Sequence, residues 1–144
     1  TDDEYNVIRI KYGDTTSVDA QIQALESLEL NARFIRNADR DIVEMEIEMG
    51  RPVIVGWLDK GPIDHPTCNS QSCGHYSVIS GYRGKNSPDP EWIMQDPRGL
   101  PDMQNGGHSN PHLGRNVRVR QSEFDARWQP EGRNTGWAIL VDDL

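Results

Sequence analysis

The chain has 144 residues, of which 35% are hydrophobic and 26% charged, and its formal net charge is −8 at pH 7. This composition is typical of a globular protein that needs no obligatory metals or disulfides, so we take residues 1–144 as a single domain. The negative charge argues against a nucleic-acid partner, because phosphate binding needs a basic surface. No apolar run is long enough to span a bilayer and no signal-peptide pattern opens the chain, so we expect a soluble protein without a membrane partner.

Helical periodicity marks the N-terminal part of the chain. Apolar residues recur at helical spacing over residues 5–12, which predicts the end of a helix whose beginning can precede the first residue. Thr16 or Ser17 can cap a second helix. The apolar stripe of that helix would consist of Val18, Ile22, Leu25 and Leu28. A short strand is predicted over residues 32–35.

A third helix is predicted to begin at Asn37 or Asp39 and to end at Gly50. Its side chains would divide into an inward apolar face and an outward acidic face. The inward face is expected to hold Ile42, Met45 and Met49, and the outward face Glu44, Glu46 and Glu48.

The rest of the chain contains short segments rich in Val, Ile, Trp and Tyr, which predict the strands of a sheet. They cover residues 52–58, 75–82, 92–95, 116–120 and 137–141. A helical turn through Trp128 is predicted between the last two, capped by Ser122 with Asp125 at the capping-box position. The four tryptophans are expected in the core. Helices first and strands afterwards indicate an α+β fold with helices packed on an antiparallel sheet.

His75 and Asp96 are candidate catalytic residues because of their places in the predicted strands. His75 begins one strand and Asp96 ends the next, so in an antiparallel pair both lie at the same edge of the sheet, within side-chain reach. They border two long loops, 59–73 and 97–115. A cysteine hydrolase needs a histidine that takes the thiol proton and a further residue that fixes its tautomer. From these positions alone, a structural histidine and an Asp-Pro strand terminator remain open interpretations.

Three runs carry a resemblance to a known family: GRPVIVGW at 50–57, GHYSVISGY at 74–82 and WIMQDP at 92–97. They resemble the signature of papain-fold cysteine peptidases of the bacteriocin double-glycine-leader-peptidase-like group, which has phage and bacterial members. The resemblance extends over nearly the whole chain and is most specific from the His to the Asp-Pro run. It implies a papain-like fold and thioester acyl transfer on peptide bonds, with His75 as base, Asp96 as the orienting residue and no cofactor.

The resemblance also implies substrates, partners and surroundings. A protein linker or the peptide stem of peptidoglycan would be the substrate, and the acidic surface favours the protein. Other virion proteins would be possible partners, in a virion-associated or secreted setting. The scissile sequence does not follow from the fold.

The chain departs from the family pattern at the nucleophile. Family members carry the catalytic cysteine at the start of a helix that precedes the region matched here, where the helix N-terminus lowers the pKa of the thiol. The resemblance therefore implies a Cys-bearing segment before residue 1, and residues 1–144 alone should hydrolyse nothing. An inactive peptidase-like binding module, or a phage virion-structural module, fits the departure as well.

The two cysteines of the chain, Cys68 and Cys73, leave several interpretations open. Cys73 lies two residues from His75, but on a strand the two side chains diverge from the sheet, which argues against Cys73 as nucleophile. A Cys68–Cys73 disulfide and two free thiols are structural alternatives. Zinc bound by both cysteines, His65 and His75 is disfavoured by the loose Cys-x4-Cys spacing, so we expect no metal. The remaining histidines are expected to be solvated: His108 and His112.

Overall fold

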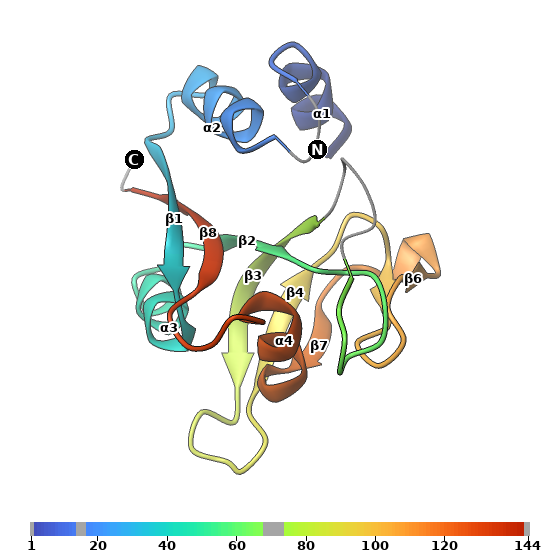
Figure 1. The fold of residues 1–144 in the computed structure, drawn as a ribbon. Helices are drawn as coiled ribbons and strands as arrows, with labels where there is room; N and C mark the ends of the chain where they lie inside the picture. Colours follow the sequence, from blue (N-terminus) through green and yellow to red (C-terminus); the bar gives the residue numbers. More distant parts are fainter. Residues whose placement is uncertain (1, 14–16, 68–73, 143–144) are drawn as a thin grey trace.

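The computed structural model describes residues 2–13, 17–67 and 74–142. Within these ranges the chain forms a six-stranded sheet whose neighbouring strands are all antiparallel (Figure 1). From one edge to the other, the strands are β1 (Ala32–Ala38), β8 (Gly136–Val141), β2 (Val53–Trp57), β3 (His75–Arg83), β4 (Glu91–Gln95) and β7 (Val117–Arg120). The predicted strands and the predicted α+β architecture are confirmed.

Four α-helices accompany the sheet in the described ranges. They are α1 (Asp2–Ile10), α2 (Val18–Ser27), α3 (Arg40–Glu48) and α4 (Gln121–Trp128). Figure 1 shows α1 and α2 together at the top, away from α3 and α4, which both pack on β2. The long loop 97–115 is not irregular throughout, because it contains the small paired strands β5 (Leu100–Pro101) and β6 (His108–Ser109) and the 3-10 turn η1 (Pro111–Leu113).

The core lies between the sheet and the two helices α3 and α4. Successive side chains of a strand point to opposite faces of the sheet, so every second side chain of β2, β3 and β4 points to this core. Buried residues therefore largely alternate with less buried ones along these strands. Helix α3 packs on β2 and β3, and α4 packs on β2 and β7. The largest fully buried apolar side chains are Trp92, Trp128, Phe124, Ile79 and Met94.

The face of α3 that packs inward differs from the predicted one. Asp39 caps the helix as expected, since its carboxylate accepts the Ile42 backbone N–H at 2.9 Å. However, Val43 and Glu46 are the buried residues of this helix. The predicted inward methionines are exposed: Met45 by 50% and Met49 by 59%. A buried Glu46 is tolerated because its carboxylate pairs with Arg51 Nε at 2.6 Å, a partner outside the helix that periodicity does not register.

Two further details of the predicted helices are wrong. Helix α4 follows β7 directly, with Arg120 at the N-cap position and no side-chain cap, so Ser122 lies inside the first turn. The expected stripe of α2 is confirmed at Leu25, which is buried, but Leu28 is 44% exposed and Ala20 and Ala24 are buried instead. The predicted cap is confirmed, since Ser17 Oγ accepts the Ala20 N–H at 3.2 Å.

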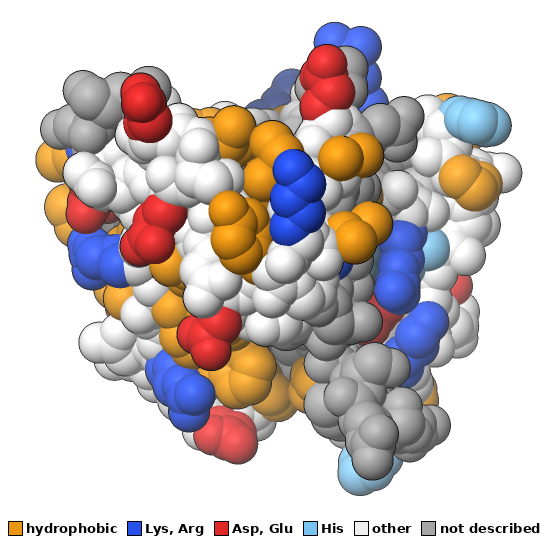
Figure 2. All heavy atoms as spheres, turned by 90° about the horizontal axis from the view of Figure 1, so that it is seen from above, with side chains coloured by type: hydrophobic (Ala, Val, Ile, Leu, Met, Phe, Trp, Pro, Cys, Tyr) orange, Lys and Arg blue, Asp and Glu red, His pale blue; other side chains and the backbone are white. Residues whose placement is uncertain are grey.

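Trp137 is the one tryptophan outside the core, being 46% exposed. Strand β8 directs it to the face opposite Ala138, where its ring meets Phe34 edge-on with centroids 5.7 Å apart. Arg36 covers both rings at 5.6 Å. Hydrophobic side chains interspersed with Lys and Arg gather near the middle of the face seen from above (Figure 2).

Arg127 fixes the two long loops to α4. Its side chain is completely buried, and the guanidinium donates four hydrogen bonds to backbone carbonyls. The acceptors are Leu58, Lys60 and Gly61 before and within the first loop, at 2.7 to 3.2 Å, and Met103 in the second, at 2.9 Å. Arg127 thereby links the two loops to each other and to α4. Among the described residues, no helix combines the length and the apolarity needed to cross a bilayer.

Candidate functional site

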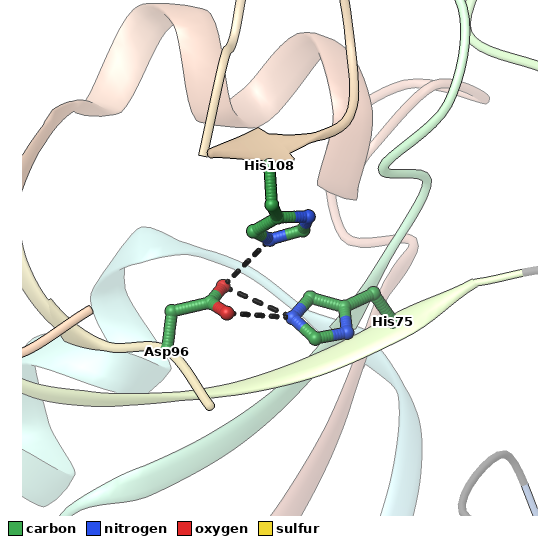
Figure 3. Close-up of side chains that lie close together, drawn as sticks. All are labelled: His75, Asp96 and His108. Carbon is green, nitrogen blue, oxygen red and sulfur yellow. Dashed lines mark hydrogen bonds and ion pairs between the residues drawn. The ribbon is translucent and has the colours of Figure 1, made fainter. Parts of the chain in front are cut away.

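His75 and Asp96 meet at one edge of the sheet, as their places in the sequence predicted. His75 is the first residue of β3, and Asp96 directly follows the last residue of β4, its antiparallel neighbour. The Nε2 atom of His75 lies 3.0 Å from each carboxylate oxygen of Asp96 (Figure 3). Both side chains are buried. The expected proximity is therefore confirmed, while their catalytic role is a separate question.

The orientation of the His75 ring assigns different tasks to its two nitrogens. Because Nε2 is held by the carboxylate, the neutral form of His75 carries its proton there and donates it, which leaves the lone pair on Nδ1. Figure 3 shows Nδ1 on the side of the ring away from Asp96. No described residue forms a hydrogen bond with Nδ1. The edge-on ring of Trp57, 5.5 Å away, packs against the imidazole and limits its rotation.

A buried hydrogen-bond chain holds Asp96 in place. Trp57 Nε1–H donates to Ser77 Oγ at 3.0 Å, and the Ser77 hydroxyl donates to Asp96 Oδ2 at 2.8 Å. The backbone N–H of Arg98 donates to Oδ1 at 2.8 Å. Burial raises the pKa of the Asp96 carboxyl, but hydrogen bonds from His108 and His75, the charge of His75 and the Arg98 N–H outweigh it and hold this pKa well below its usual range. Asp96 is therefore a carboxylate at neutral pH.

His108, which was expected to be solvated, belongs to the same cluster. Its side chain is only 6% exposed, and its Nε2 lies 3.1 Å from Asp96 Oδ2. The His75 and His108 rings meet edge-on with centroids 4.6 Å apart. The expectation was wrong because β6 folds back from the second long loop over the end of β4. The other loop histidine, His112, is exposed as expected.

Asp59 brings a second buried carboxylate to this edge. It follows β2 and is 2% exposed, with Oδ2 3.7 Å from His108 Nδ1. The cations that face it, Arg98 Nη1 at 3.4 Å and Lys60 Nζ at 3.8 Å, have side chains about half exposed to solvent. His108 Nδ1 itself is buried without a hydrogen-bond partner. His75, Asp96 and His108 offer ligand atoms within 4.8 Å of one another and could hold a metal ion.

A sequence signal for His108 exists in the two glycines before it. Gly106 and Gly107 both have φ of +84°, a region that L side chains rarely adopt. At Gly106 a Cβ would stand 2.6 Å from the carbonyl oxygen of Gly61, so only glycine lets the two long loops approach this closely. The Gly107 N–H also donates to the Asp59 carbonyl at 2.6 Å. The glycine pair thus marks the point where the loops join and His108 turns inward.

The cysteine alternatives are not tested by the structure, since Cys68 and Cys73 lie outside the described residues. His65, a ligand in the zinc alternative that uses them, is exposed, whereas His75 is buried. Comparison with models of known families, with curated proteins and with solved structures finds no match to this chain.

Proposed function

We propose that this chain provides the histidine and the aspartate of a cysteine peptidase site on a papain-like fold. The observation that carries the proposal is the orientation of His75, whose Nε2 is bound by Asp96 at 3.0 Å while Nδ1 keeps an unshared lone pair. An imidazole held in this way can accept a proton from a thiol and return it to a leaving group. The buried Asp96 carboxylate then stabilises the imidazolium without taking its proton.

The reaction would be acyl transfer on a peptide bond. His75 Nδ1 takes the thiol proton, the thiolate attacks the carbonyl carbon, and the imidazolium protonates the leaving amine as the C–N bond breaks. Water then attacks the thioester with Nδ1 again as base, which releases the acid and restores the thiol. A protein segment or the peptide stem of peptidoglycan is the proposed substrate class, and the net charge of −8 favours the former.

The thiol is proposed to come from a Cys-bearing segment before residue 1. In the resembled family the nucleophile lies on a helix before the matched region, and no described side chain is hydrogen-bonded to His75 Nδ1. Exposed apolar residues on α1, Val7 at 62% and Ile10 at 65%, offer a surface on which such a segment could pack. Because the resembled family has phage members, a phage setting is part of the proposal.

One observation favours a second candidate, an inactive peptidase-like binding or virion-structural module. His75 is only 6% exposed, which leaves little room for a substrate carbonyl beside the ring in the described arrangement. In that case the Asp96 cluster would be a structural network at the edge of the sheet.

Thiol reactivity separates the two candidates. The gene should be expressed with its upstream sequence, and the rate of alkylation by iodoacetamide measured for the wild type, His75→Ala and the control His112→Ala. A peptidase predicts one rapidly alkylated cysteine and a rate that falls about 10²-fold or more in His75→Ala but not in the control. Equal rates in all three would instead support the inactive module.

Residues 1–144 alone should hydrolyse no peptide, because His75 would have no thiol to activate. Peptidase activity of this segment that Cys73→Ser abolishes would overturn the external thiol and make Cys73 the nucleophile.

A further inference from the structure

The cluster of His75, Asp96 and His108 has the composition of a transition-metal site. Two imidazoles and one carboxylate are ligands that zinc prefers, and zinc sites with three protein ligands keep a fourth position for water. Both Nε2 atoms point at the same carboxylate, 3.0 Å and 3.1 Å from its oxygens. Ligand atoms on a tetrahedral zinc ion lie about 3.3 Å apart, so a small widening of the cluster would admit the ion.

His108 Nδ1 is the second, independent observation. When Nε2–H donates to Asp96, a neutral His108 has a lone pair on Nδ1, and this buried atom has no hydrogen-bond partner. It lies 3.7 Å from Oδ2 of Asp59. In this form both atoms are acceptors, so they cannot form a hydrogen bond with each other. A cation on Nε2 would place the proton on Nδ1. This N–H could then donate a hydrogen bond to the Asp59 carboxylate. Metal-binding histidines commonly donate their other N–H to a carboxylate in this way.

The charges of the buried carboxylates also favour a bound metal ion. Asp59 and Asp96 are both buried. Asp59 faces the half-exposed Arg98 and Lys60 at 3.4 and 3.8 Å and also interacts with the charge of the buried Arg127, whereas no Lys or Arg among the described residues forms an ion pair with Asp96. Asp96 is thus a buried carboxylate whose only partners able to carry a positive charge among the described side chains are the two histidines. A buried charge is costly unless it is paired or coordinates a metal. A dication bound by both imidazoles would pair it.

We propose that His75, Asp96 and His108 bind one zinc-class dication, with Asp59 accepting the Nδ1–H of His108. This site is distinct from zinc bound through the two cysteines, because it uses neither of them. Binding leaves each imidazole neutral, with its proton moved from Nε2 to Nδ1. Zinc would then block the proposed peptidase, since His75 Nδ1 could no longer accept a thiol proton. That consequence rests on the proposed function, whereas the binding does not.

Calorimetric titration of ZnCl₂ into the EDTA-treated 144-residue chain tests the binding. We expect one ion per chain and a loss of affinity of more than about 100-fold in His108→Gln, whose amide can still donate to Asp96 but is a poor zinc ligand. Asp59→Asn should weaken binding about 10- to 100-fold, as expected for a residue that only orients a ligand. His112→Gln and the double variant Cys68→Ser/Cys73→Ser should bind like the wild type.

The wild type supplies a readout that does not depend on the folding of a variant. Imidazole ¹⁵N NMR should show Nε2 of His75 and His108 shifting at one equivalent of Zn²⁺, with the proton on Nδ1. No saturable binding, unchanged signals of these two histidines, wild-type affinity in folded His108→Gln, or loss of binding in the cysteine double variant would each overturn the site. The alkylation test without metal decides the peptidase separately, so either proposal can fail alone.

Discussion

Replacing Arg127 by methionine should destabilise the protein and release both long loops. Methionine fills a similar volume but removes the donors of four hydrogen bonds, whose carbonyl acceptors lie in segments 58–61 and at Met103. Each bond contributes about 1 kcal/mol net, so the expected loss is about 4 kcal/mol. This is a large part of the 5–15 kcal/mol typical of a domain and corresponds to a fall in Tm of roughly 10–15 °C. Arg127→Lys should lose less, because an ammonium group keeps some of the donors without the planar fork.

Urea unfolding followed by tryptophan fluorescence gives the free energy of unfolding, and amide hydrogen exchange locates the effect. Exchange should accelerate at Gly107, whose N–H donates across the loops to the Asp59 carbonyl, and little in the central strands. The matched control is Arg133→Met, since Arg133 is exposed just after α4 and should change stability by less than about 0.5 kcal/mol. A loss below about 1 kcal/mol in Arg127→Met, or unchanged exchange at Gly107, would refute the role assigned to Arg127.

Two further predictions concern packing and surface electrostatics. Gly136→Ala should lose about 1–3 kcal/mol in urea unfolding, because the new Cβ would stand 2.5 Å from the Trp128 ring. Gly81→Ala is its control, with the nearest contact at 3.5 Å and an expected change within about 0.5 kcal/mol. Tyr82→Phe should raise the pKa of Glu48, because the Tyr82 hydroxyl that donates to it at 2.9 Å is the main cause that lowers this pKa. An NMR titration of the Glu48 carboxyl that is the same in Tyr82→Phe and wild type would contradict that bond.

The sheet was predictable from the sequence because its strands differ from the rest of the chain in the types of side chain they contain. Buried strands such as β2 and β8 are rich in Val, Ile and Trp, and the predicted limits of these two strands agree with the structure within one residue. The end of β1 was predicted three residues too early. The orientation of α3 was not predictable. Met45 and Glu46 are neighbours on the helix, and hydrophobicity alone directs the methionine inward. Only the contact with Arg51, which depends on how the chain turns after the helix, explains why Glu46 is buried.

The sequence predicted that His75 and Asp96 lie together, but it did not predict that His108 and Asp59 join them. Antiparallel pairing of two consecutive strands is local in sequence, and it brings the start of one to the end of the next, which places His75 beside Asp96. His108 and Asp59 reach the cluster through loops instead. Their positions depend on contacts such as those of Arg127, which lies 67 residues from Lys60 and 24 from Met103, so the glycine pair before His108 marks a close approach of backbone without showing what it approaches.

The geometry of Asp96 makes the two proposals about this site compatible. Its carboxylate oxygens accept hydrogen bonds from His75, His108, Ser77 and the Arg98 backbone, so its position and its negative charge are fixed on all sides. A carboxylate held in this way orients whatever occupies the Nε2 side of His75. With a proton there, Nδ1 is a base available to a thiol. With a metal ion there, the proton moves to Nδ1 and the base is lost. If both proposals hold, the same side chains define an active and a blocked form, which differ in whether protons or a shared metal ion occupy Nε2 of His75 and His108.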